Sequence, residues 1–257
     1  MATAIEKLQP KDKSMPVVIF HGDKGGVGKS WTAAAFTDFL VKNQIPVALV
    51  DGDTQNADVS RMFGDAIPVS NANLRDHGGW MDLTDFMMAH QDKVVVISMP
   101  AGIGHDLRKE APRFGQTIQM LKRPVSMFWV INRLPDSVNL LNEALAAIGD
   151  HLQSKFVVKN LFFGDEGKFS RWDLSETRKR FEKTGGVTIK LTELHERTVD
   201  KLYADNDNIM PFSAAVMPVN AAEKSPHGLT PSENMELICW LQDNHKTFEV
   251  LRPALGI

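Results

Sequence analysis

The chain has 257 residues and a formal net charge of −3, with 43% hydrophobic and 24% charged residues, which excludes a largely disordered or fibrous protein. Its single cysteine, Cys239, excludes an intrachain disulfide and any zinc or iron–sulfur site that needs several cysteines. No apolar run approaches the roughly 18 residues that cross a bilayer, and the polar start is not what we expect of a secretory signal. We therefore expect a cytoplasmic protein without a membrane partner.

From Met15 onward, short apolar runs alternate with helical patterns. The runs are rich in Val and Ile and lack polar alternation, which is typical of strands buried on both faces. They are Val17–His21, Val47–Asp51, Val94–Ser98, Val125–Ile131 and Phe156–Phe163, and the helical patterns are Lys29–Asn43, Asp82–His90, Leu107–Leu121 and Ser137–Leu152. The alternation predicts an α/β fold: a doubly wound, mostly parallel sheet flanked by helices.

The rest of the chain gives no sign of a second domain. Residues 164–206 are charged, with two helical stretches around Gly185 and Gly186, and no Pro/Ser-rich linker precedes them. The apolar spacing of Ser232–Asn244 predicts a helix that packs onto the sheet. We expect a flexible segment over residues 1–14 and one domain over residues 15–257, with residues 164–206 as a surface excursion.

A glycine-rich loop follows the first predicted strand and leads into the first predicted helix. In such a loop, backbone N–H groups surround phosphates, Lys29 can reach the β- and γ-phosphates, and the Ser30 hydroxyl can bind Mg²⁺. The expected nucleotide contacts are Asp23, Lys24, Gly25, Gly26, Val27, Gly28, Lys29, Ser30 and Trp31.

The loop departs from the common P-loop pattern, which has glycine where this sequence has Asp23. Instead, Lys24 stands directly before Gly25 and Gly26, and here the sequence resembles the ParA/MinD superfamily of P-loop ATPases with a deviant Walker A motif. In that family the extra lysine reaches the phosphates of the partner in an ATP-bound dimer. The resemblance implies this role for Lys24, an ATP-dependent homodimer, and ATP with Mg²⁺ as cofactors.

Two later segments extend the resemblance. Asp51-Gly52-Asp53-Thr54-Gln55-Asn56 is similar to the family's switch I motif, with Thr54 where Pro is usual. The resemblance implies that Asp53 positions the attacking water and that Asp51 lies near Mg²⁺ through a bound water. An acidic turn that merely ends a strand is the alternative interpretation.

The segment Ile97–Gly104 is similar to switch II, Asp-x-Pro-Ala-Gly, with Ser98 in place of the Mg²⁺-holding aspartate. Three interpretations follow: Asp51 takes over that role, hydrolysis is slow, or the protein is mainly a binding switch.

Two residues are expected beside the adenine by the same resemblance. Asn132 follows the fourth predicted strand, although it can equally be a residue that caps the strand end, and Pro211 lies in the loop Met210–Ser213. The basic residues between Lys168 and Lys183 suit DNA phosphates, but interleaved acidic residues favour a solvated, ion-paired helix face. The histidines show no metal-site spacing.

The favoured function is an ATP-dependent dimerising switch with slow hydrolysis, closest in character to plasmid partition or conjugation-associated ParA-like proteins. It would act in DNA segregation, plasmid maintenance or cargo positioning, with an adaptor or centromere-binding partner, non-specific DNA contact and nucleoid association as further possibilities. An ATP-dependent ligase similar to dethiobiotin synthetase and a pseudo-ATPase adaptor are the alternatives. Lys24 favours the switch over the ligase, and Ser98 keeps the adaptor open.

Overall fold

The computed structural model describes residues 14–204, 209–217, 225 and 227–257. Of the N-terminal segment expected to be flexible, residues 1–13 lie outside this description, as do residues 205–208, which include the end of the predicted excursion. Within the described residues, no helix is both long enough and apolar enough to span a membrane.

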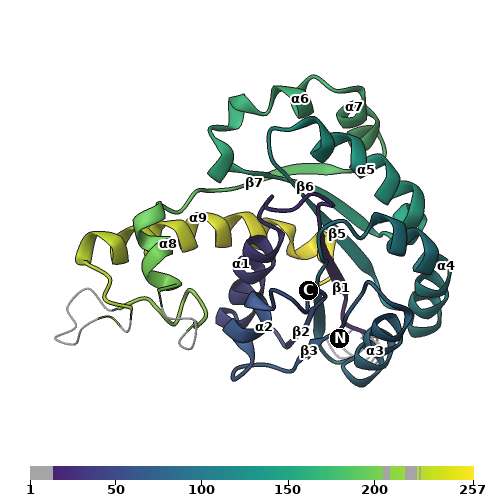
Figure 1. Cartoon of the computed structure of the whole chain (residues 1–257), viewed down its shortest axis with the longest axis horizontal. Coiled ribbons are helices and arrows are strands. Elements are labelled where there is room, and N and C mark those ends of the chain that lie inside the picture. The colour runs from purple at the N-terminus through teal and green to yellow at the C-terminus, as the bar shows by residue number, and fades with distance from the viewer. Residues whose placement is uncertain (1–13, 205–208, 218–224, 226) are drawn as a thin grey trace, which may run out of the picture.

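A seven-stranded sheet with the strand order β3-β2-β4-β1-β5-β6-β7 lies at the centre of the molecule (Figure 1). Every neighbouring pair in it is parallel. The strands are β1 Val17–His21, β2 Val47–Asp51, β3 Val69–Asn71, β4 Val94–Ser98, β5 Val125–Ile131, β6 Ser154–Asn160 and β7 Val187–Leu191.

Helices cover both faces of the sheet. One hydrophobic cluster joins the sheet to α1 Lys29–Lys42, α2 Asp58–Phe63, α8 Glu196–Leu202 and α9 Pro231–Leu255. A second cluster on the opposite face joins it to α3 His77–Ala89, α4 Gly104–Leu121, α5 Pro135–Ile148, α6 Ser170–Asp173 and α7 Glu176–Lys183 (Figure 1). The predicted doubly wound α/β fold is confirmed.

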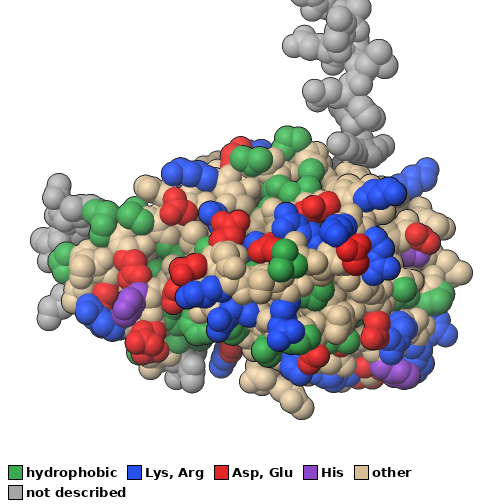
Figure 2. All heavy atoms as spheres, turned by 90° about the horizontal axis from the view of Figure 1, so that it is seen from above, with side chains coloured by type: hydrophobic (Ala, Val, Ile, Leu, Met, Phe, Trp, Pro, Cys, Tyr) green, Lys and Arg blue, Asp and Glu red, His purple; other side chains and the backbone are tan. Residues whose placement is uncertain are grey.

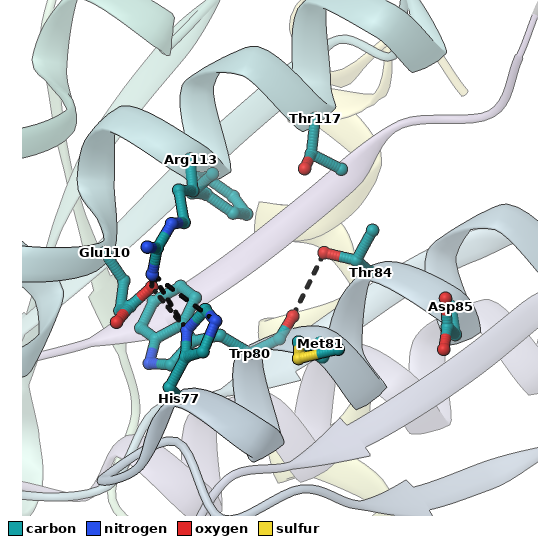
Figure 3. A pocket seen from close by; sticks show the side chains of 9 residues that line it. His77, Trp80, Met81, Thr84, Asp85, Glu110, Arg113 and Thr117 are labelled. Atoms are coloured by element: carbon teal, nitrogen blue, oxygen red, sulfur yellow. Dashed lines mark hydrogen bonds and ion pairs between the residues drawn. The ribbon is translucent and has the colours of Figure 1, made fainter.

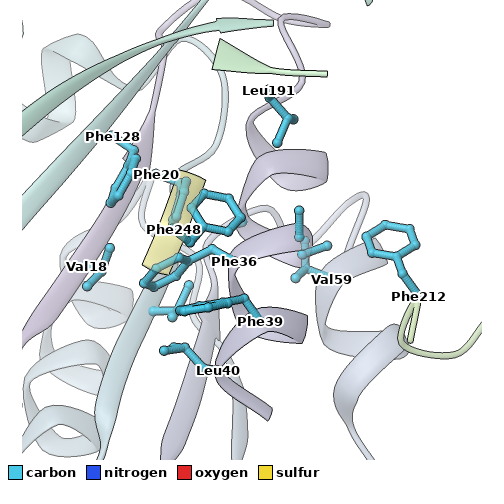
Figure 4. Packing of buried hydrophobic residues seen from close by; sticks show 14 of the residues in the cluster. Val18, Phe20, Phe36, Phe39, Leu40, Val59, Phe128, Leu191, Phe212 and Phe248 are labelled. Atoms are coloured by element: carbon cyan, nitrogen blue, oxygen red, sulfur yellow. The ribbon is translucent and has the colours of Figure 1, made fainter. Parts of the chain in front are cut away.

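An aromatic cluster holds α1 against the sheet (Figure 4). Phe36 of α1 lies with its ring centroid 5.5 Å from Phe20 of β1, 5.6 Å from Phe128 of β5 and 5.2 Å from Phe248 of α9. Phe20 and Phe128 are themselves stacked at 4.8 Å. Because α1 begins directly after the glycine-rich loop, this packing fixes the helix end on which the loop rests.

The secondary structure differs from the sequence prediction mainly at the sheet edges. The segment expected as a purely helical excursion contains α7 and α8 but also the edge strand β7 between them. β6 ends at Asn160 rather than Phe163, because residues 161–163 form a 3-10 turn that begins where the Asn160 side chain accepts the Phe162 N–H. α3 begins five residues earlier than expected, at His77, because the Asp76 side chain caps it by accepting the Gly79 N–H.

The C-terminal helix also differs from the prediction. α9 runs well past Asn244, where the predicted helix ends, to Leu255. Pro253 lies in the last turn, where the helix is about to end at Gly256, whose φ of 79° gives the left-handed cap.

Replacement of Phe36 by alanine should remove the central ring of the aromatic cluster and leave a cavity between α1, α9 and the sheet. We expect Phe36→Ala to lower the free energy of unfolding by about 3–5 kcal/mol, measured by urea denaturation. Val250→Ala, on the exposed side of α9, is the control and should change it by less than about 0.5 kcal/mol. Equal effects of the two substitutions would contradict this view of the core.

Candidate functional site

Parallel pairing brings the predicted motifs to one edge of the sheet. Phe20 of β1 pairs with Ser98 of β4, and Ser98 also pairs with Asp51 of β2. The loops that follow these three strands carry the phosphate-loop, switch I and switch II sequences. They therefore lie side by side at the carboxyl edge, where open α/β sheets bind their ligands.

The glycine-rich loop has the backbone conformation of a phosphate cradle. Gly26 and Gly28 have φ values of 72° and 93°, in the left-handed region that side chains disfavour. A Cβ at Gly26 would meet no atom within 4 Å, so the loop has open space beside it. A Cβ at Gly28 would lie only 2.2 Å from Asn160 Nδ2, so close approach to β6 requires glycine there.

Lys29, the first residue of α1, is buried beneath the loop. Its ammonium donates a hydrogen bond to the Lys24 carbonyl oxygen at 3.1 Å. Burial lowers the Lys29 pKa to about 8, while Asp23 and Asp53 oppose that shift and Arg75 adds to it. A buried ammonium beside inward-turned amides suits an anion, so the loop fits nucleotide phosphates.

Asp23 ties the phosphate loop to switch II. Its Oδ1 accepts the Gly104 N–H at 3.0 Å, and its backbone oxygen accepts the Gly102 N–H at 2.7 Å. The residue that replaces the usual glycine therefore holds the start of α4. Its expected contact with the nucleotide stays a prediction, because the described bonds of its carboxylate and carbonyl point to switch II.

Asp51 is buried at the end of β2. Its two oxygens accept the N–H groups of Asp53 and Ser60, at 3.3 and 3.2 Å, and burial raises its pKa to about 6. Asp53 is partly exposed and accepts the Gln55 N–H at 3.2 Å. The carboxylates of Asp51 and Asp53 thus both lie in the switch I segment, next to the buried Ser98.

Ser30 and Asp51, the residues expected around Mg²⁺, carry the oxygen donors that this ion prefers, and their role stays a prediction. No group of three or more His, Cys, Asp or Glu side chains in the described part of the chain could hold a metal ion by itself. Ser30, directly after Lys29, is half-buried and at the loop. Mg²⁺ would bind the Ser30 hydroxyl and phosphate oxygens, with Asp51 reaching it through water.

A cavity of about 200 Å³ lies next to the glycine-rich loop. Loop glycines form one wall, and the ends of β6 and β7 form the other. Its lining residues are Gly26, Gly28, Trp31, Asn160, Phe162, Phe163, Thr192, Glu193, Leu194 and Val199. Apolar walls with a few polar groups, directly beside the glycine-rich loop, suit the base of a nucleotide.

Asn160 is one of the pocket residues that the sequence analysis missed. Its Nδ2 donates to the Val27 carbonyl oxygen at 2.9 Å, which joins β6 to the glycine-rich loop. Asn132 lies in the turn between β5 and α5, where its Oδ1 accepts the Leu134 N–H and the Ser137 hydroxyl at 2.9 and 2.7 Å. Its expected place beside the adenine stays a prediction.

Two further predicted contacts, Lys24 and Pro211, lie in different surroundings. Lys24 is half-exposed and pairs with Asp136 of α5 at 2.9 Å. Pro211 is half-buried and precedes Phe212, whose ring centroid lies 4.7 Å from that of Trp31. Neither Pro211 nor Phe212 lines the pocket, and the role of Pro211 at the base stays a prediction.

The charged segment around α6 and α7 is laced with ion pairs. Arg178 contacts Asp173 and Glu182 at 2.9 and 2.7 Å, and Lys179 contacts Glu176 at 2.6 Å. Figure 2 shows basic and acidic side chains interleaved on this side of the molecule. The favoured interpretation, a solvated and ion-paired helix face, is confirmed for these residues.

Fold and site together define a P-loop nucleotide-binding protein. Residues 18–163 match the CobQ/CobB/MinD/ParA nucleotide-binding domain family, and the chain belongs to that family. It is 32% identical over 193 residues to Protein MobD of Acidithiobacillus ferrooxidans, an alignment that covers 75% of this chain and 84% of the relative. Cell division protein FtsY of Thermotoga maritima has a similar fold, with a TM-score of 0.51 and 16% identity over 89% of this chain and 69% of that one.

Nucleotide affinity should depend on pH through Lys29. Bound phosphates raise the ammonium pKa, so binding above about pH 8 first requires proton uptake. We expect affinity for a non-hydrolysable fluorescent ATP analogue to be flat from pH 7 to 8 and to fall up to about tenfold per pH unit above it. Calorimetry in two buffers of different ionisation enthalpy should show the proton uptake.

Lys29→Arg is the control, because the guanidinium stays protonated over this range. Its affinity should show no slope above pH 8, whatever its absolute value. A flat profile for the wild-type protein, or an equal slope in Lys29→Arg, would remove Lys29 from the phosphate site.

Proposed function

We propose that this protein is an ATP-binding, ATP-dependent dimerising switch with slow ATP hydrolysis, acting in DNA segregation, plasmid maintenance or the positioning of a cargo. The observation that carries the proposal is a second lysine, Lys24, at the solvent side of a loop whose buried lysine is Lys29. ATP, Mg²⁺ and the homodimer come from the family resemblance. Similarity to Protein MobD supports membership of the plasmid- or conjugation-associated branch.

The two lysines have different surroundings, and therefore suit different tasks. Lys29 is buried and serves the nucleotide of its own chain. Lys24 is held only by a half-exposed pair with Asp136, and such surface pairs contribute about 0–1 kcal/mol. Lys24 can leave Asp136 at little cost and reach the phosphates of a second nucleotide site.

Slow hydrolysis follows from the carboxylates at the sheet edge. Asp53 is the partly exposed one and can orient an attacking water. Ser98 supplies a neutral hydroxyl where the family has an aspartate, so Mg²⁺ would depend on Ser30, the phosphates and Asp51 through water. A pseudo-ATPase adaptor is the second candidate, and Ser98 is the observation that favours it.

The proposed partners are a second copy of the chain and an adaptor or centromere-binding protein, in the cytoplasm or at the nucleoid. Non-specific DNA contact would use Arg171, Arg180 and Lys183, basic residues of the α6–α7 segment that remain exposed on that surface.

Removal of the Lys24 ammonium tests the dimer. Lys24→Ala should keep ATP binding but lose ATP-induced dimerisation in light scattering, because the charge that would meet the partner's phosphates is gone. Asp136→Ala is the control: it frees Lys24, and ATP-induced dimerisation should be retained or strengthened. A wild-type protein that stays monomeric with ATP and Mg²⁺ would disprove the switch and favour the ligase alternative.

The carboxylates can be tested by phosphate release. Asp53→Ala should remove the slow hydrolysis, while Ser98→Asp should tighten Mg²⁺ binding at least severalfold and leave the rate unchanged or higher. Without Mg²⁺, Ser98→Asp should be less stable than wild type, because it places a second buried carboxylate beside Asp51. Brisk turnover that survives Asp53→Ala would show that another group acts, and no turnover with DNA or partners present would favour the adaptor.

A further inference from the structure

A groove of about 320 Å³ lies between α3 and α4, on the sheet face opposite α1 (Figure 3). Trp80 and Phe114 form its apolar floor, with their ring centroids 5.9 Å apart. Thr84 of α3 and Thr117 of α4 also line it. Neither the phosphate loop nor the base pocket uses any of these residues.

Three exposed methionines follow the same two helix faces. Met81 lines the groove and is 56% exposed. Met88 lies seven residues further along α3, and Met120 seven residues beyond Arg113 on α4, with exposures of 46% and 61%. Seven residues return a side chain to nearly the same helix face, so the methionines extend the apolar strip beyond the groove. Flexible methionines in this setting suit a protein partner that buries them.

An exposed arginine, Arg113, lies at the end of the groove nearest the carboxyl edge of the sheet, paired with a buried carboxylate. Glu110 is buried there, and its Oε2 lies 3.1 Å from His77 Nδ1 and 3.3 Å from Arg113 Nη1. Burial raises the Glu110 pKa, but the hydrogen bonds from His77 and Arg113 outweigh it and hold the pKa below its ordinary value. Arg113 is exposed and keeps further guanidinium donors for a ligand.

Negative charge lies at the other end. Asp85 is exposed, lines the groove, and follows His77 by eight residues, which is roughly 12 Å along a helix. Figure 3 shows Arg113, His77 and Glu110 at one end, Asp85 at the other and Met81 between them. The groove therefore has an exposed guanidinium, paired with buried Glu110, at one end, an apolar middle, and an exposed carboxylate at the other end.

We propose that the α3–α4 groove binds an amphipathic helix of a partner protein, which presents an acidic residue to Arg113, an apolar residue to the Trp80–Phe114 floor and a basic residue to Asp85. On one helix face these residues fall about four and eight positions apart. Two neighbouring helices present parallel ridges of side chains, and a third helix packs between them.

The groove is connected to switch II. The Arg75 guanidinium, two residues before α3, donates to the Ala101 carbonyl oxygen at 2.6 Å, and α4 begins where Gly104 is held by Asp23. A partner helix that inserts between α3 and α4 would therefore act on the switch II segment. This consequence rests on the proposed function, whereas the docking itself does not require nucleotide.

The test selects helices against the full-length, nucleotide-free protein. A display library of 20-residue helices on an Ala/Glu/Lys scaffold, with one face randomised, supplies the probes, and their affinities are measured by fluorescence anisotropy. We expect selected helices to carry the acidic–apolar–basic pattern. Arg113→Gln and Asp85→Lys should each weaken their binding at least tenfold.

Two matched controls lie on the same helices outside the groove lining, Lys109→Gln on α4 and Asp82→Lys on α3. They should change the affinity less than twofold. Affinity of the ATP analogue, measured on the same samples, should be unchanged in all four variants, which separates a failure of the groove from a failure of the nucleotide site.

Three results would overturn the proposal. Selection could yield no helices, or helices whose binding responds equally to the groove and control substitutions. If light scattering showed that Arg113→Gln loses self-association while Lys109→Gln keeps it, the groove would instead be an interface between copies of this chain.

Discussion

Parallel pairing of β1, β2 and β4 is the constraint on which the candidate site depends. Because these strands run in one direction and pair in register, the residues after each of them meet at one edge. The site is formed by the loops that follow these three strands, and the three loops are far apart in the sequence. A shift of β4 by one residue would turn Ser98 to the opposite face of the sheet.

The loops at this edge are held by backbone contacts as much as by side-chain chemistry. Asp23 fixes the start of α4, and Asn160 fixes the loop from the β6 side. Asp23 stands where the common P-loop pattern has glycine. This replacement provides a hydrogen bond that links the phosphate loop to switch II. The phosphate loop is thereby coupled to α4, which forms one wall of the α3–α4 groove.

The parts of the fold that could be predicted are those whose burial requires a continuous run of apolar residues. The bounds of β1, β2, β4 and β5 were correct because these strands are buried on both faces and read as unbroken apolar runs. β3 and β7 are edge strands, short or half-exposed, and carry no such signal. Asn160 was missed because the apolar run continues through Phe163, which hid the end of β6; its polar side chain within that run was the available signal.

Burial of Lys29 places an ammonium with a lowered pKa beside the glycine-rich loop. A pKa lowered from 10.5 to about 8 corresponds to roughly 3 kcal/mol of unfavourable surroundings for the ammonium. The aromatic packing of α1 and the hydrogen bond from Asn160 to Val27 hold the loop in place. The loop therefore does not rearrange to expose the Lys29 ammonium to water. In the proposed nucleotide complex, phosphates would replace the Lys24 carbonyl oxygen as the partner of the Lys29 ammonium and would offset part of the cost of its burial. That exchange would release the Lys24 carbonyl, so binding at the buried lysine would change the surroundings of the exposed one.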